Sequence, residues 1–294
     1  MSNFIPTAFA DEICDDLNGQ MDVLDRHGIK FIEFRGADGK GVADYSLEEA
    51  KAARLRMEAR GFAVSALGSP VGKTFIDDDF EPAFAQFRHV VELAKAFGTQ
   101  YIRMFSYFIP EGDAPVIWRG EVMRRIQAMA EYAEQASVIL LHENEKAIYG
   151  DTPERCRDIF DTVQSPALWC TYDPSNFVQC GVRNYPHAFQ MLKDKIHYVH
   201  MKDSVYTARE KEADAGFDTH VVSDAHRPVG QGDGNCREIL AELWRDGYEG
   251  FLSIEPHLVN NHDIPGTGAD KFAVAAEALK KLIFEIQAEE ASHE

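Results

Sequence analysis

The chain has 294 residues, of which 45% are hydrophobic and 27% are charged, and these proportions exclude a chain that is disordered along its whole length. Asp and Glu (49) outnumber Lys and Arg (30), so the formal charge of −19 argues against nucleic acid or an anionic membrane as the main partner. No apolar run reaches the roughly 18 residues of a membrane helix, and the N-terminus shows no secretion signal. Five cysteines without a C-x-x-C pair favour reduced thiols in a cytoplasmic protein.

Short strand-like runs alternate with longer helical patterns along the whole sequence. The predicted strands, in chain order, are residues 7–13, 31–36, 62–68, 101–106, 138–143, 168–173, 196–201 and 250–255. Apolar residues at helical spacing lie between them, and several of these segments are followed by a capping glycine: Gly28, Gly61, Gly98 and Gly247. Eight strands, each followed by a helix or a long connection, predict an α/β fold of the (β/α)8 TIM-barrel type, with residues 1–294 as a single domain.

The main competing fold is an open doubly wound sheet, which usually carries a glycine-rich phosphate loop after its first strand. Here the first predicted strand runs into Asp11-Glu12-Ile13-Cys14, which contains no such loop. The barrel is therefore favoured. Residues 108–115 and 204–227 are predicted as loops, and the length and charge of the second are typical of a lid or an interface.

The last four predicted strands end in polar side chains, namely Glu143, Asp173, His200 and Glu255. Because the carboxyl ends of barrel strands open on one mouth and neighbouring strands lie about 4.8 Å apart, these side chains can converge on one ion. Strand alternation also places each of them inward, above mostly apolar residues. Three carboxylates and one imidazole suit Mn²⁺ or Mg²⁺, with Co²⁺ or Zn²⁺ as further options. The alternative is that each residue forms a separate salt bridge or helix cap.

Seven motifs are spread over nearly the whole chain: Phe9-Ala10-Asp11-Glu12-Ile13, Ile32-Glu33-Phe34-Arg35-Gly36, His142-Glu143-Asn144, Asp173-Pro174-Ser175-Asn176, His200-Met201-Lys202-Asp203, Pro228-Val229-Gly230-Gln231-Gly232-Asp233 and Glu255-Pro256. Together they resemble the sugar phosphate isomerase/epimerase family of xylose-isomerase-like TIM barrels. Its relatives include ketose 3-epimerases, hydroxypyruvate isomerase, inosose dehydratase and C-glycoside-cleaving subunits. The resemblance implies one divalent metal ion, Mn²⁺ first, held by Glu143, Asp173, His200 and Glu255. It also implies that Glu143 and Glu255 move protons.

Further polar residues are expected at the same mouth. Lys202 could polarise a substrate oxygen and His226 could move a proton, so both are catalytic candidates, although His226 fits a surface loop equally well. The candidate substrate contacts are Asn176, Arg227, Glu33 and Arg35. Glu33 and Arg35 could instead form salt bridges with their neighbours.

The sequence departs from the family pattern at Asn176. Asn176 stands where many relatives carry His, and because Asn is a poor metal ligand, a second metal is not expected.

Asp203 could orient a ligand or cap a helix. Glycines 230, 232 and 234 could cradle a phosphate through backbone N–H groups, but a tight turn is the favoured interpretation.

These residues predict a divalent-metal-dependent sugar isomerase or epimerase that removes a proton next to a carbonyl, with the metal stabilising the enediolate. A metal-dependent lyase or dehydratase on an oxo-sugar shares the first step and is the alternative, including C-glycoside deglycosylation as a subunit of a complex. An abasic-site endonuclease is a remote alternative, and a barrel that binds sugar without turnover is another. The expected partners are a small sugar, oxo-sugar or glycoside and further copies of the chain, with room for a second subunit, but neither nucleic acid nor membrane.

Overall fold

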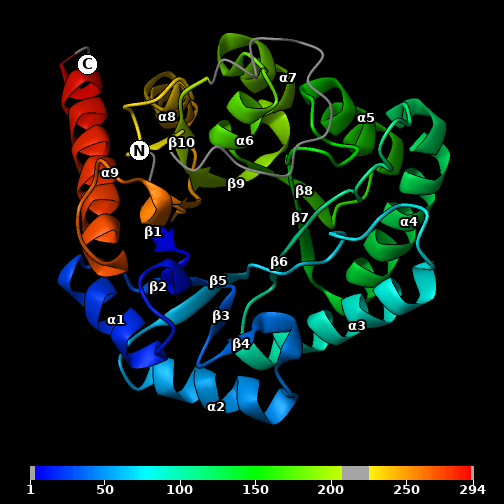
Figure 1. The fold of residues 1–294 in the computed structure, drawn as a ribbon, viewed down its shortest axis with the longest axis horizontal. Coiled ribbons are helices and arrows are strands. Elements are labelled where there is room, and N and C mark those ends of the chain that lie inside the picture. The colour runs from blue at the N-terminus through cyan, green and yellow to red at the C-terminus, as the bar shows by residue number, and fades with distance from the viewer. Residues whose placement is uncertain (1–3, 207–224, 293–294) are drawn as a thin grey trace.

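The computed structural model describes residues 4–206 and 225–292. Eight parallel strands form one sheet in the order β1-β12-β9-β8-β7-β6-β5-β2, which curls into a nearly closed barrel (Figure 1). The strands are β1 (Ile5–Ala8), β2 (Phe31–Phe34), β5 (Ala63–Leu67), β6 (Tyr101–Met104), β7 (Ile139–Glu143), β8 (Leu168–Tyr172), β9 (Ile196–Met201) and β12 (Phe251–Ile254). The predicted (β/α)8 barrel is confirmed.

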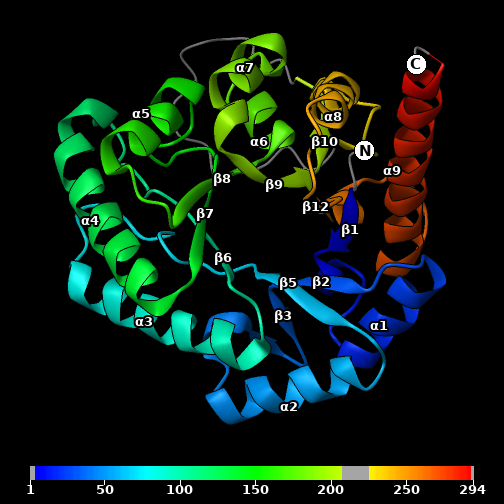
Figure 2. The ribbon, with the colours of Figure 1, turned by 180° about the vertical axis from the view of Figure 1, so that it is seen from behind.

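Helices form a ring outside the strands, and both views show it on all sides of the barrel (Figures 1 and 2). They are α1 (Leu17–Arg26), α2 (Leu47–Glu58), α3 (Phe80–Phe97), α4 (Pro115–Ala136), α5 (Pro153–Val163), α6 (Pro174–Gln179), α7 (Phe189–Leu192), α8 (Cys236–Arg245) and α9 (Gly268–Ala291). Local signals set their ends: Ser46 and Glu49 form a capping box at the start of α2, and Gly98 ends α3 in the left-handed conformation. Within the described residues, no helix combines the length and apolar character needed to cross a membrane.

The first strand begins earlier than the sequence predicts. β1 covers Ile5–Ala8, and Ala10–Glu12 forms a 3-10 turn instead of continuing the strand. A short run with apolar residues fits either conformation, so the predicted boundary was wrong. Of the two predicted loops, the first (residues 108–115) leads into α4, which begins at Pro115, whereas residues 207–224 of the second lie outside the described residues. The ends of that second loop pair as two short strands, β10 (Asp203–Ser204) and β11 (His226–Arg227).

The lower barrel is filled by the side chains that strand alternation places inward. Leu141 and Tyr198 pack there with Ala66, and a ring of partly buried residues closes the cluster: Tyr101, Ile139, Trp169 and Phe251. The hydroxyl groups of Thr7, Ser65 and Tyr198 form a buried hydrogen-bonded chain with distances of 2.7 and 2.9 Å. This packed floor supports the polar residues at the carboxyl ends of the strands.

Candidate metal centre

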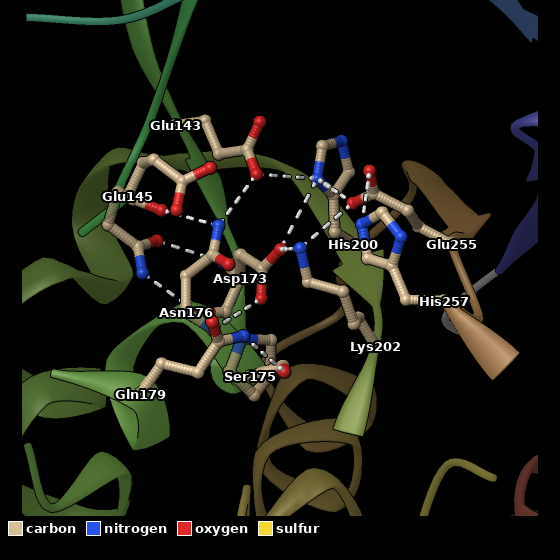
Figure 3. A network of polar contacts seen from close by, with 12 residues as sticks. Glu143, Glu145, Asp173, Ser175, Asn176, Gln179, His200, Lys202, Glu255 and His257 are labelled. Carbon is tan, nitrogen blue, oxygen red and sulfur yellow. Dashed lines mark hydrogen bonds and ion pairs between the residues drawn. The ribbon is translucent and has the colours of Figure 1, made fainter. Parts of the chain in front are cut away.

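Four buried side chains converge at the carboxyl ends of adjacent strands. Glu143 ends β7, Asp173 follows β8, His200 lies in β9 and Glu255 follows β12. One donor atom from each residue lies within 4.8 Å of the others, and Figure 3 shows the four pointing toward one another. The Nδ1 atom of His200 is 3.3 Å from carboxylate oxygens of both Glu143 and Glu255. Among the described residues this buried nitrogen has no hydrogen-bond partner, so the donor set fits a divalent cation.

Glu33 lies behind His200. Its carboxylate is 3.2 Å from the Nε2 atom of His200, and both side chains are fully buried. A hydrogen bond from Nε2–H to Glu33 would leave the lone pair of Nδ1 directed at the other three donors. The structure therefore places Glu33, predicted as a substrate contact, where it orients a candidate ligand.

We expect replacement of Glu33 to weaken divalent metal binding. Glu33→Gln keeps an acceptor for Nε2 but removes the negative charge, whereas Glu33→Ala removes both, and losses of outer partners of this kind typically lower metal affinity about 10- to 100-fold. Titration of the purified variants with Mn²⁺ measures the effect, with the exposed Glu58→Gln as the control. Unchanged Mn²⁺ affinity in Glu33→Ala would show that His200 needs no such support.

Lys202 places an ammonium group inside the acidic cluster. Its Nζ atom is 2.7 Å from Asp173 and 3.2 Å from Glu255, and the side chain is buried (Figure 3). Burial disfavours the charged form, but the carboxylates of Asp173 and Glu255 outweigh it and raise the pKa of Lys202 well above its usual value. Lys202 therefore remains protonated at neutral pH and partly neutralises the acids.

Different cationic side chains lower the pKa values of Glu143 and Glu255. Burial alone would favour their neutral forms, but His200 and Arg103 bring the pKa of Glu143 well below its usual range. For Glu255, Lys202 and His257 have the same effect. Both side chains are thus carboxylates at neutral pH, and Figure 3 shows them reaching the cluster from opposite sides.

Asn176 fixes the orientation of Glu143. Its side-chain amide donates 2.9 Å hydrogen bonds to Oε1 of Glu143 and to the carbonyl of Asn144. The backbone N–H of Asn176 in turn donates to Asp173, which is the N-cap of α6, and Pro174 occupies the first helical turn. The motif Asp173-Pro174-Ser175-Asn176 therefore builds a short helix whose cap is also a candidate ligand.

The other predicted site residues, Arg35, His226 and Arg227, lie outside the four-residue donor set. Arg35 forms ion pairs with Asp11 (2.7 Å), Glu255 (3.1 Å) and Glu12 (3.4 Å), so it braces one candidate ligand. The ring of His226 packs 5.2 Å from the ring of His257 and lies outside the four-residue donor set.

His226 and Arg227 form β11. The Nε2 atom of His226 is 3.4 Å from the side-chain amide of Gln179, and burial lowers the pKa of His226 to about 3, so its ring is neutral at pH 7. The guanidinium of Arg227 donates a hydrogen bond to the carbonyl of His226.

The glycine-rich segment forms a turn around Asp203. The carboxylate of Asp203 accepts hydrogen bonds, each of 2.9 Å, from four backbone N–H groups: Ser204, Gly230, Gly232 and Gly234. A side chain at position 232 would collide with this carboxylate, which explains the glycine there. The favoured tight turn is confirmed, and the chain's own carboxylate takes the place that a phosphate would need.

Sequence reasoning missed Arg103 and His257. Arg103 lies in β6, two residues after the inward-facing Tyr101, and its guanidinium is 3.2 Å from Glu143. The signal was available, since a charged residue at an inward position of a strand needs a buried partner. His257 is 3.3 Å from both Glu255 and Glu12, and its loop position gave no comparable signal.

A cavity of about 490 Å³ opens at the mouth beside this centre. Its lining includes Glu143, Glu255 and Lys202 from the cluster and extends to the loops that follow β2 and β5. The site and the fold together define a (β/α)8 barrel with a buried carboxylate–imidazole centre at the mouth where barrel enzymes place their active sites.

Comparison with known proteins agrees with this class. The model of the family described as "Xylose isomerase-like TIM barrel" matches residues 21–282, so the chain belongs to that family. Fructoselysine 3-epimerase from Shigella flexneri is 24% identical over 217 residues, which cover 70% of this chain and 71% of that protein.

Two solved structures share the fold at low sequence identity. The probable 3-DHS dehydratase AsbF from Bacillus anthracis superposes with a TM-score of 0.70 at 18% identity, covering 95% of this chain and 99% of that one. The IOLI protein, solved with a binding zinc atom, gives a TM-score of 0.73 at 16% identity, with 97% and 99% covered.

Proposed function

We propose that the protein is a divalent-metal-dependent sugar isomerase or epimerase that removes a proton next to a carbonyl group and returns it at a different position or face. The observation that carries the proposal is the pair of buried carboxylates, Glu143 and Glu255, that approach one four-residue donor set from opposite sides. The resemblance to a fructoselysine 3-epimerase supports the same reaction class.

The residues have complementary roles in this proposal. Glu143, Asp173, His200 and Glu255 hold the cation, for which we propose Mn²⁺. When bound, the cation would supply Lewis-acid polarisation of the carbonyl, which makes the neighbouring C–H group more acidic. Glu143 and Glu255 take and return the proton, while Asn176 keeps Glu143 in place and Lys202 donates a hydrogen bond to a substrate oxygen.

A lyase or dehydratase on an oxo-sugar is the second candidate, and the position of Lys202 favours it. A buried ammonium beside Glu255 could donate a hydrogen bond to a leaving hydroxyl group, while the carboxylic acid formed by removal of the C–H proton returns that proton to the leaving oxygen. Isomerisation or epimerisation conserves the substrate's composition, whereas elimination releases water or an aglycone. Analysis of the products therefore separates the two reactions.

The test is proton exchange with solvent. Protein stripped with a chelator and protein reloaded with Mn²⁺ are incubated in D₂O with a panel of ketoses, inososes and 3-oxo glycosides, and deuterium incorporation is followed by NMR. We expect incorporation into a C–H next to a carbonyl in at least one substrate, and only with Mn²⁺. Exchange that is equally fast in stripped protein, or no exchange with any member of the panel, would contradict the proposal.

A further inference from the structure

Besides Lys202, three cationic side chains line the mouth cavity, and they stack on two aromatic rings. The guanidinium groups of Arg35 and Arg103 lie over the ring of Phe9, with carbon-to-centroid distances of 4.6 and 5.0 Å. Arg103 and Lys73 likewise lie over the ring of Phe105, at 4.9 and 4.2 Å. Stacking of this kind restricts the rotamers of long side chains, so the cations keep fixed positions along the cavity.

Arg103 has more donors than partners. Its side chain is 6% exposed and carries five N–H donors, yet its contacts are an ion pair with Glu143 at 3.2 Å and a 3.5 Å hydrogen bond to the carbonyl of Ser69. Its Nε atom is buried without a hydrogen-bond partner among the described residues. The two terminal nitrogens carry four of the five N–H donors and have only these two contacts, so Arg103, which lines the cavity, has N–H groups left for a further acceptor.

Lys73 stands nearer the entrance of the cavity. Its side chain is 36% exposed, and its Nζ atom forms an ion pair with Glu145 at 3.3 Å. A partly exposed pair at this distance contributes little stability, so Lys73 can exchange Glu145 for an incoming anion at little cost.

The charges of the cavity-lining residues indicate the sign of the missing group. Arg103 and Lys73 both line the cavity and both are cations, so a ligand group that contacts them is an anion. The glycine turn offers no alternative anion site, because Asp203 already accepts its N–H groups.

We propose that Arg103 and Lys73 form a subsite for an anionic group of the substrate, a carboxylate or a phosphate, beside the candidate metal centre. The inference rests on the proposed function, because the metal centre must hold the carbonyl end of the same molecule. The protein should then prefer an acidic sugar or a sugar phosphate to the neutral ketose of the same skeleton.

The test compares ligands that differ in a single group. Calorimetry on the full chain, with and without Mn²⁺, measures the affinities of D-fructose, of 2-keto-D-gluconate, which carries a carboxylate in place of the C1 hydroxymethyl group, and of D-fructose 1-phosphate. We expect at least one of the two anions to bind about tenfold or more tightly than fructose, since hydrogen bonds to charged groups are the stronger ones. The better anion identifies whether the subsite prefers carboxylate or phosphate.

Two variants connect the preference to the subsite. Lys73→Gln should lower the affinity for the better anion about tenfold and leave the affinity for fructose unchanged. Arg103→Gln should lower the affinity for the better anion about tenfold more than the affinity for fructose, because Arg103 also holds Glu143. Lys51→Gln, an exposed lysine on α2, is the charge-matched control and should change neither. Because Arg103 contacts Glu143, the Mn²⁺ affinity of each variant is measured alongside.

The outcomes separate this inference from the proposed function. Equal binding of all three ligands, or equal loss of fructose and anion in the variants, would overturn the subsite even if Mn²⁺ binds and exchange occurs. An anion preference that disappears in both variants supports the subsite, even in a protein that shows no proton exchange.

Discussion

Replacing Glu143 or Glu255 by Gln is expected to slow proton exchange at the substrate carbon by roughly 10²- to 10⁴-fold, the usual contribution of a positioned acid or base. Glutamine has nearly the same shape and keeps one oxygen for the cation or for the neighbouring donors. It cannot take a proton at neutral pH. The substitution therefore removes proton transfer while disturbing the site as little as the chain allows.

The two variants also distinguish one-base from two-base chemistry. If each glutamate serves one face of the substrate, each variant should still exchange the proton of one epimer and not of the other. Deuterium incorporation into both epimers, at saturating Mn²⁺, gives this result directly. Glu92→Gln, which disrupts only an exposed ion pair with Lys95, serves as the control. Wild-type rates in both active-site variants would contradict a role for these carboxylates in proton transfer.

The convergence of the four candidate ligands was predictable because strand alternation and the parallel arrangement of the barrel together determine where their side chains lie. Alternation along a strand determined that Glu143 shares a face with Leu141, and the structure packs Leu141 in the barrel interior. The parallel barrel then places the ends of neighbouring strands on one mouth, so four residues far apart in sequence meet within 4.8 Å. Local pattern and fold class together were sufficient for this part of the site.

The partners of these residues were not predictable in the same way. Glu33 lies 167 positions from His200 in the sequence, and whether it contacts substrate or His200 depends on side-chain packing across the barrel. The same holds for Asn176, whose amide is directed to Glu143 by the geometry of a short helix. Spacing along the chain contains no information about such contacts between different strands.

Asp203 illustrates a partial success. The glycine spacing correctly predicted a tight turn, since closely spaced glycines allow the backbone to fold around an anion. Which anion occupies the turn depends on the position of β9 relative to residues 230–234, and the structure places the carboxylate of Asp203 there. A phosphate was therefore an open alternative until the fold was known.

Replacing Lys202 by Met is expected to destabilise the metal-free protein by about 3–5 kcal/mol, because it leaves buried carboxylates without their cation. The raised pKa of Lys202 means that the folded chain binds this proton more tightly than the unfolded chain. Its contribution to stability is therefore complete below the unfolded pKa of about 10.4 and is lost as the pH rises through the higher pKa of the folded state. Urea unfolding at pH 7 measures the full effect.

Mn²⁺ should reverse most of this loss, since a divalent cation can replace the ammonium beside Asp173 and Glu255. A ligand at about 100 times its Kd stabilises a folded protein by roughly 2.7 kcal/mol, and the gain should be larger in Lys202→Met because no ammonium competes for these carboxylates. Lys271→Met is the matched control: Lys271 is also buried, but it donates to the carbonyls of Val259 and Asn261. That variant should lose the same stability with or without Mn²⁺. An equal loss in Lys202→Met under both conditions would show that the cation does not replace the ammonium beside these carboxylates.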